Sequence, residues 1–244
     1  MLFDFLHALS VIALFAGVIS AAIIALDETR HPQRMAIMNL VWPITGLYAG
    51  PLALWAYYRY GRLAEHGRGE RAPARDETPP HRAQTPYPVK IGKGAAHCGA
   101  GCTLGDICAE WLALFYPTIA VWLGYGTIVA DKIFAIWILD YVFAFGFGIV
   151  FQYFTIKPMR DLTVRQGLVA AVKADALSLT AWQVGMYGFM ALAQFWLFRR
   201  VLGVALDVAM PEFWFMMQIA MMAGFATSYP VNGWLIRRGI KEAM

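Results

Sequence analysis

Hydrophobic residues dominate six long segments of the chain, and polar residues collect between them. Each segment has about 20 residues, the helical length that crosses a hydrocarbon core of about 30 Å. None alternates between polar and apolar residues as a barrel strand does, so helices are the expected spanning structure. We therefore predict an all-α polytopic membrane protein with six transmembrane helices, at residues 8–26, 35–58, 108–128, 133–156, 176–197 and 213–235.

The composition agrees with a chain that is solvated mainly by lipid. Of the 244 residues, 59% are apolar and 15% are charged, whereas a soluble domain has about 45–50% and about 25%. The mean hydropathy is +0.53. These values exclude a soluble enzyme, a disordered regulator and a disulfide-rich secreted domain, and they make the lipid bilayer the first expected partner.

A polar segment divides the chain in two. Residues 61–96 are rich in Arg, Pro, Gly and Glu, and such a composition cannot bury enough apolar surface to fold alone. We interpret this segment as a basic cytoplasmic linker. It separates a two-helix transmembrane hairpin at residues 1–60 from a four-helix transmembrane unit at residues 97–244.

Basic residues predict the orientation of these helices. Most of the 20 Lys and Arg residues lie in the segments 59–104 and 157–167 and in the C-terminal tail. By the positive-inside rule, these segments and both termini are expected on the cytoplasmic side of the cell inner membrane. The net charge of +4 is then a feature of topology, and we expect no nucleic-acid partner.

One motif combines the residue types that bind soft metals. His97, Cys98 and Cys102 lie among glycines, and Cys108 follows six residues later. Thiolate and imidazole groups are the donors that Cu(I) and Zn prefer. We expect the glycines to fold residues 97–105 into a tight cytoplasmic loop in which these four residues hold the metal. The alternatives are reversible thiol chemistry and a tight turn whose cysteines only pack.

Polar and sulfur-containing side chains at membrane depth form a second set of candidates. Asp106 is expected to cap the helix after the loop, with Glu110 one turn later. Intramembrane acids usually face a cavity or a partner, because exposure to lipid costs several kcal/mol. Methionines spaced one turn apart either pack adaptably or pass Cu(I) along a path. The candidate pathway residues are Asp106, Glu110, Asp140, Asp175, Met186, Met190, Met217 and Met221.

Several stretches together resemble a family of prokaryotic integral membrane proteins described only as a domain of unknown function. They are Arg30-His-Pro-Gln, Trp42-Pro-Ile-Thr, the His-Cys-x3-Cys-x3-Asp motif that begins at His97, and Ser228-Tyr-Pro-Val-Asn. The resemblance covers nearly everything except the linker. It implies a membrane protein and nominates His97, Cys98 and Cys102 as ligands, but it implies no activity.

These observations favour a membrane transport protein or metallochaperone for a soft metal, most simply copper. A membrane oxidoreductase with a metal- or thiol-based redox centre is the first alternative. An ion or proton channel, or a scaffold subunit, is the second. The sequence holds no nucleotide-binding loop and no hydrolase motif, which weighs against an enzyme of those classes. Assembly into a homo-oligomer is compatible with all of these functions.

Overall fold

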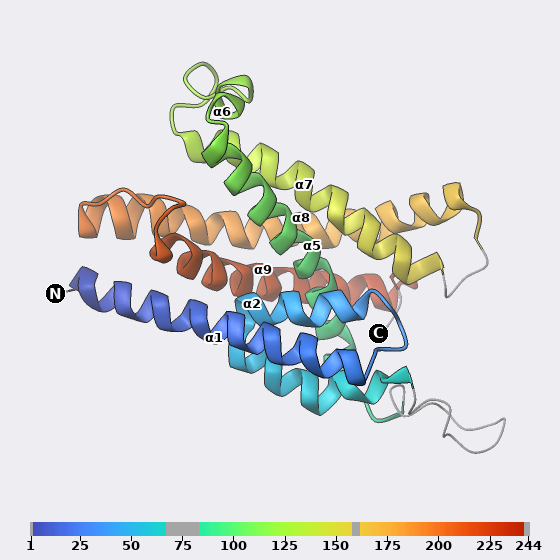
Figure 1. Ribbon diagram of the computed structural model, residues 1–244. Helices are drawn as coiled ribbons and strands as arrows, with labels where there is room; N and C mark the ends of the chain where they lie inside the picture. Colours follow the sequence, from blue (N-terminus) through green and yellow to red (C-terminus); the bar gives the residue numbers. More distant parts are fainter. Residues whose placement is uncertain (1, 67–82, 158–161, 242–244) are drawn as a thin grey trace, which may run out of the picture.

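The computed structural model describes residues 2–66, 83–157 and 162–241. These residues form an all-helical bundle in which α1, α8 and α9 run roughly along one another, while α7 is inclined to them and α5 crosses obliquely (Figure 1). The helices are α1 (Leu2–Arg30), α2 (Met38–Ala56), α5 (Tyr87–Phe115), α6 (Thr118–Trp122), α7 (Lys132–Ile156), α8 (Val164–Ala191) and α9 (Pro211–Arg237). Short helical segments extend α2 and α8: η1 (Tyr57–Gly61), η2 (Arg62–Ala64) and η4 (Leu192–Leu202).

Three of the described helices, α1, α5 and α7, are long and apolar enough to cross a membrane. Helices α8 and α9 have 28 and 27 residues but do not reach the apolar content that this criterion requires. The all-α class and the association with a membrane therefore agree with the sequence prediction, although six spans are not evident.

The segment predicted as the second span is a helical hairpin that reverses direction at Gly50. The backbone of Gly50 is non-helical, with φ 52° and ψ −130°, directly before Pro51. Both ends of the hairpin meet, because Arg34 N–H donates to Ala64 O (2.8 Å) and His66 N–H donates to Pro32 O (2.9 Å). Its tip reaches the middle of α1, since a Cβ at Gly46 would lie 2.9 Å from Ala21 Cα.

Gly50 is the residue that permits this reversal. A side chain is strongly disfavoured at its backbone angles, so we expect Gly50→Ala to lower the free energy of unfolding by roughly 1–3 kcal/mol. Gly188→Ala is the matched control, because a Cβ at this helical glycine would meet nothing within 4 Å; there we expect no loss. Thermal unfolding of the two purified variants measures the difference, and equal midpoints would contradict the role of Gly50.

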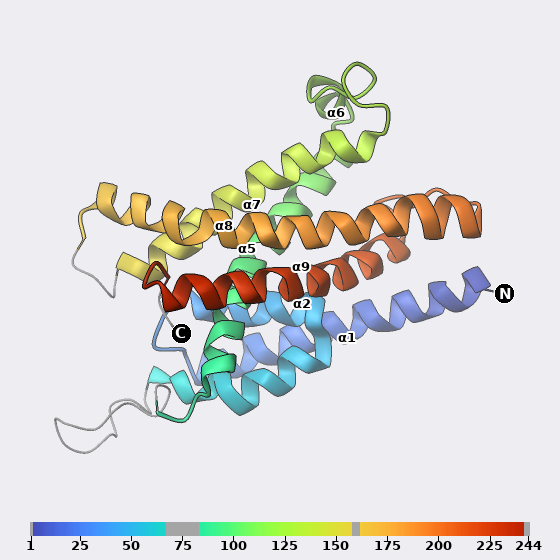
Figure 2. The same ribbon diagram turned by 180° about the vertical axis from the view of Figure 1, so that it is seen from behind.

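The start of α1 and the end of α9 lie at opposite ends of the bundle in both side views (Figures 1 and 2). His7 Nδ1 and Glu212 Oε1, 2.6 Å apart, join the start of α1 to the start of α9. Since α9 then runs to the other end, the first residues of α1 and the last residues of α9 lie at opposite ends of the bundle, whereas the sequence predicts both termini on one side. The hairpin at Gly50 accounts for this difference, because the segment predicted as a crossing returns to the end from which it entered.

The expected metal-binding loop at residues 97–105 is also absent, because these residues lie in the middle of the continuous helix α5. This helix begins at Tyr87, inside the predicted linker, and ends at Phe115; residues 67–82 of that linker lie outside the described part. The predicted third span at 108–128 was therefore displaced, and α6 forms a separate short helix after it.

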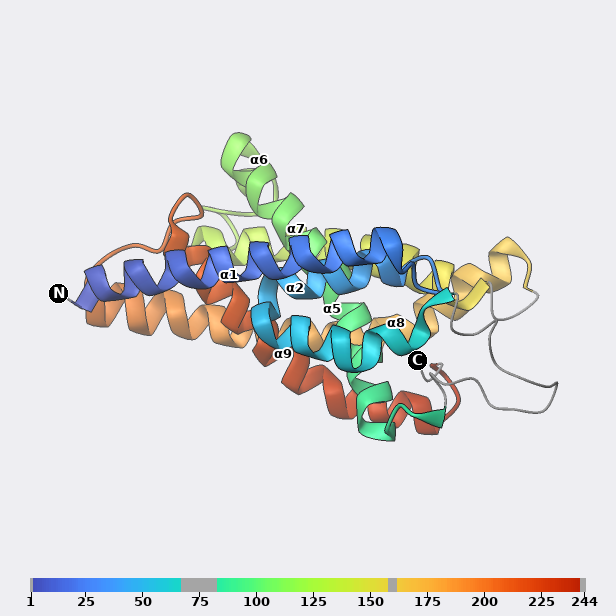
Figure 3. The same cartoon turned by 60° about the horizontal axis from the view of Figure 1, so that its bottom comes forward.

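The glycines of α5 serve close packing. A Cβ at Gly101 would lie 3.1 Å from Gly148 Cα on α7, and one at Gly105 would collide with the backbone of Ala144. Gly101 and Gly105 form the small-xxx-small pattern that lets membrane helices approach closely. Viewed with the bottom of the bundle turned forward, α5 lies between α7 on one side and the α2 hairpin and α9 on the other (Figure 3). The buried face of α5 is thus surrounded by other helices.

Candidate functional site

A row of polar side chains runs along the buried face of α5. Cys98, Cys102, Asp106 and Glu110 are spaced four residues apart, which places them on one face of the helix. All four are buried. At 1.5 Å per residue, the row extends about 18 Å along the helix axis, more than half of a hydrocarbon core of about 30 Å.

Helices α7 and α8 add three polar residues to this row. Asp140 on α7 interacts electrostatically with Asp106 and Glu110. Gln183 on α8 lies beside Asp106. Asp175, also on α8, lies beside Cys98. All three are about 99% buried. We call the following seven residues the polar row, in order along the bundle: Asp175, Cys98, Cys102, Gln183, Asp106, Asp140 and Glu110.

The polar row is poorly satisfied by the protein itself. Within the described part of the chain, both carboxyl oxygens of Asp106 and Asp140 and both amide atoms of Gln183 lack a well-formed hydrogen bond. Burying a polar group without a hydrogen bond costs roughly 2–7 kcal/mol, and an unpaired charge costs more. Protons, water or a cation are the groups that would satisfy these atoms.

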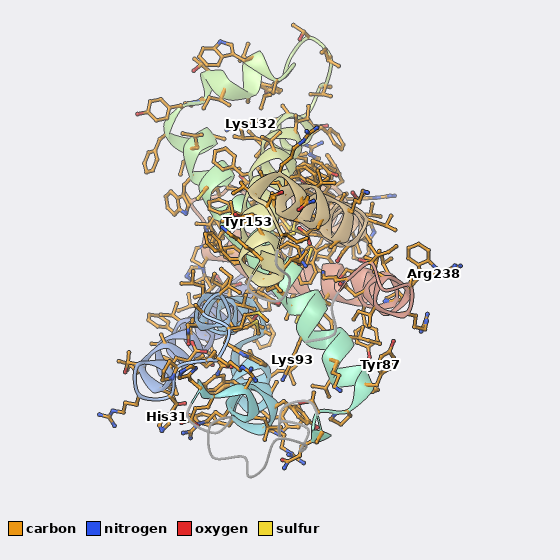
Figure 4. The ribbon with its side chains drawn as sticks, turned by 90° about the vertical axis from the view of Figure 1, so that its right-hand side faces the viewer. His31, Tyr87, Lys93, Lys132, Tyr153 and Arg238 are labelled. Atoms are coloured by element: carbon orange, nitrogen blue, oxygen red, sulfur yellow. The ribbon has the colours of Figure 1, made fainter. Side chains whose placement is uncertain are left out.

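A lysine accompanies the acid at each end of the row. At one end, Lys241 Nζ lies 3.9 Å from Asp175 Oδ1 and donates to Gly94 O at 3.2 Å. At the other end, Glu110 interacts with Lys132 at the start of α7. The viewing direction of Figure 4 looks along the bundle, and Lys132 is labelled there. The row therefore runs through the interior of the bundle between two lysines, Lys241 and Lys132.

Sulfur atoms line the middle of the row. Cys98 and Cys102 belong to the same buried cluster as the four candidate methionines, and Met216 joins them. Thr103 Oγ1 donates to Met221 Sδ at 3.7 Å, which fixes this thioether against α5. The four candidate methionines therefore lie in the same buried cluster as the cysteine pair, and Met221 contacts α5: Met186, Met190, Met217 and Met221.

The four predicted metal ligands are not brought together. His97 is buried on a neighbouring line of α5, where its Nε2 lies 2.8 Å from Thr155 Oγ1. Cys108 is exposed on the outside of the helix. Among the described residues, no group of three or more His, Cys, Asp and Glu side chains has the arrangement of a metal site. The prediction of one four-residue ligand set therefore has no geometric support.

Two aromatic residues beside the row were missed from the sequence. Trp182 packs against Gly99 of α5 and Gly224 of α9, and Tyr48, near the tip of the α2 hairpin, packs edge-on against Trp182 with ring centroids 5.9 Å apart. The glycines at 99 and 224 were the available signal, because they mark where a large ring must fit. Tyr48 places the hairpin tip beside Cys98 and Cys102, with which it interacts.

Comparison with known proteins places the chain in a family. Residues 89–241 match the model of a domain of unknown function, DUF4396, and because the match covers more than half of the chain, the protein belongs to this family. The matched region contains the whole polar row. No curated protein and no solved structure matches the chain.

Proposed function

We propose that this protein moves a cation across a membrane along the polar row. The observation that supports this most directly is the continuous line of buried acids, amide and thiols between Lys241 and Lys132. Buried acids without partners are costly, so a protein that serves only as a scaffold gains nothing from keeping Asp106 and Asp140 in its interior. Favourable interactions with a cation that passes along the row would offset the free-energy cost of burying these acids.

We propose a topology of five crossings, by α1, α5, α7, α8 and α9, with the α2 hairpin entering and leaving on one side. Of the Lys and Arg residues that the structure describes, most lie in chain segments at the end of the bundle that holds Lys241. The positive-inside rule makes that end cytoplasmic, in the inner membrane of the cell. The N-terminus would then lie on the opposite side.

Labelling of single cysteines tests this topology. In a Cys108→Ser background we expect Leu2→Cys to react with a membrane-impermeant maleimide on right-side-out spheroplasts, whereas Arg238→Cys should react only after lysis. Both positions are exposed, so burial would not mask either. Equal reactivity of the two positions before lysis would return the topology to six crossings with both termini on one side.

The sulfur atoms beside the row favour Cu(I) as the cargo. Thiolates and thioethers select Cu(I) among the metals of biology, and Cys98, Cys102 and Met221 present them together. Zinc sites usually have four closely arranged ligands, and the described residues offer no comparable group of nitrogen, oxygen and thiolate donors. The protein would hold Cu(I) in transit and not as a resident cofactor.

Flux into proteoliposomes tests the cargo. We expect the double variant Cys98→Ser/Cys102→Ser to slow Cu(I) entry at least about tenfold, because a hydroxyl is a poor ligand for a soft ion. Cys108→Ser is the matched control, since this thiol faces away from the row, and it should transport at the wild-type rate. Unchanged Cu(I) entry in the double variant would refute copper as the cargo.

Protons are the second candidate cargo. This choice is supported by Asp106, Asp140 and Gln183, whose side chains lack well-formed hydrogen bonds within the described part of the chain. The two cargoes make different predictions for one variant. Proton flux would survive Cys98→Ser/Cys102→Ser, because the acids and the amide remain, whereas Cu(I) flux would not. A disulfide that forms between the two cysteines during turnover would instead support the oxidoreductase alternative.

A further inference from the structure

A second site lies in the half of the bundle that holds Lys241, on the side of Tyr48 away from the polar row and lined by none of the row's residues. A cavity of about 330 Å³ opens between the two arms of the α2 hairpin, the first turns of α5 and the second half of α9. Cavities of about 300–1,000 Å³ are typical of small-molecule sites. This cavity is open at one side, where the helices that form it would face lipid.

The walls of the cavity are almost entirely apolar and are rich in aromatic rings. Six rings line it: Trp42, Tyr48, Trp55, Tyr60, Phe225 and Tyr229. Tyr229 is fixed by its hydroxyl, which donates to Pro88 O at 3.0 Å. Gly92 on α5 forms part of the opposite wall, where an added Cβ would lie 3.7 Å from Phe225 Cζ. Such walls suit a hydrocarbon chain.

One charged residue lines this apolar cavity. Lys93 is 93% buried, and its Nζ donates a hydrogen bond to Tyr60 O at 3.0 Å. An ammonium group has three donors, and within the described part of the chain this is its one hydrogen bond, with no carboxylate in ion-pair range. Trp42 Nε1, on another wall, also lacks a hydrogen-bond acceptor among the described residues. The buried ammonium group of Lys93 and the free N–H donor of Trp42 would both be satisfied by an anionic group bound in the cavity.

We propose that this cavity binds an anionic phospholipid, with one acyl chain between the aromatic rings and the phosphate at Lys93. Figure 4 shows Lys93 between α5 and the segment that returns from the hairpin. Basic pockets between helices on the cytoplasmic side are known to bind acidic headgroups. In the topology proposed above, the cavity lies in the cytoplasmic half of the bundle. The site does not depend on the transport proposal.

Lipid binding by the full chain tests the proposal. Delipidated protein in detergent is titrated, in native mass spectrometry, with dioleoylphosphatidylglycerol, dioleoylphosphatidylcholine or oleate. We expect the anionic phospholipid to bind at least about tenfold more tightly than the zwitterionic one. Lys93→Met should abolish this preference, Lys93→Arg should retain it, and Gly92→Leu should weaken both phospholipids by filling the cavity.

Lys157→Met is the control, because Lys157 lies over the ring of Tyr153 on α7, away from the cavity, and it should keep the preference. Thermal unfolding confirms that each variant is folded, and retention by Lys93→Arg separates loss of charge from loss of structure. Equal binding of the two phospholipids to the wild type, or a preference that survives Lys93→Met, would overturn the proposal. Oleate that binds as tightly as phosphatidylglycerol would overturn it in favour of a fatty acid.

Discussion

Asp140→Asn is expected to lower cation flux at least about tenfold while the protein stays folded. Asp140 is 1% exposed and lies in the polar row with Asp106 and Glu110 as neighbours. Asparagine has nearly the same shape but carries no charge, so a cation in transit loses one source of stabilisation in a medium of low dielectric constant. An increase of about 1.4 kcal/mol in the barrier to transport is enough to lower the rate tenfold.

Asp131→Asn is the matched control for Asp140→Asn. Asp131 is the residue directly before α7, the helix that carries Asp140. Its side chain is partly exposed and forms an ion pair with Arg199 at 2.7 Å. Exposed ion pairs contribute little to stability. Its variant should transport at the wild-type rate. Flux is measured in proteoliposomes at equal protein density, with thermal unfolding as the check on folding. An Asp140→Asn variant that is folded and transports normally would remove Asp140 from the path.

Gly105→Ala is expected to give the largest loss of stability among single changes on α5. A Cβ at residue 105 would collide with backbone atoms of Ala144 on α7, and a backbone cannot rotate away as a side chain can. The two helices must separate, and overpacking of this kind costs about 1–3 kcal/mol. Because α5 carries four residues of the polar row, flux should fall together with the unfolding temperature.

Gly146→Ala, on α7, is the control for this prediction. A Cβ at Gly146 would meet nothing within 4 Å, and alanine is a better helix former than glycine by about 0.5–1 kcal/mol. This variant should therefore be as stable as the wild type or more stable. If Gly105→Ala unfolds at the same temperature as Gly146→Ala, the close contact between α5 and α7 is not a source of stability.

The long apolar helices were predictable from the sequence because their pattern is local. The spans expected at residues 8–26, 133–156 and 213–235 lie within α1, α7 and α9. Burial of Asp140, Asp175 and the methionines also follows from their positions in apolar segments. By contrast, the glycines of residues 99–105 were misread. Glycine breaks helices in water but permits close packing between helices in lipid, and Gly101 with Gly105 has the spacing of the second case.

The α2 hairpin could not be derived from its own residues. Gly50 and Pro51 indicate an interruption, but a kinked spanning helix has the same local signal. The reversal shows in the backbone hydrogen bonds between residues 32–34 and 64–66, which are far apart in sequence. Because of this reversal, the start of α1 and the end of α9 lie at opposite ends of the bundle.

The four predicted metal ligands do not share one face of α5, for a geometric reason. In a loop, Cys108 could turn back towards Cys98 and Cys102. In a helix with 3.6 residues per turn, the six residues after Cys102 amount to one and two-thirds turns, which places Cys108 on the far side of α5. Cys98 and Cys102 are one turn apart and share a face. Two of the three cysteines, Cys98 and Cys102, therefore lie on the same buried face of α5 as Asp106 and Glu110.

The most direct measurement is the rate of Cu(I) entry into vesicles that contain the wild-type protein, followed with a Cu(I)-specific chelating dye inside the vesicles. Protein-free vesicles and vesicles with Asp106→Asn serve as references. Conduction along the polar row predicts saturable entry in the wild type and a rate at least about tenfold lower in Asp106→Asn. Wild-type vesicles that take up neither Cu(I) nor protons faster than protein-free vesicles would contradict it.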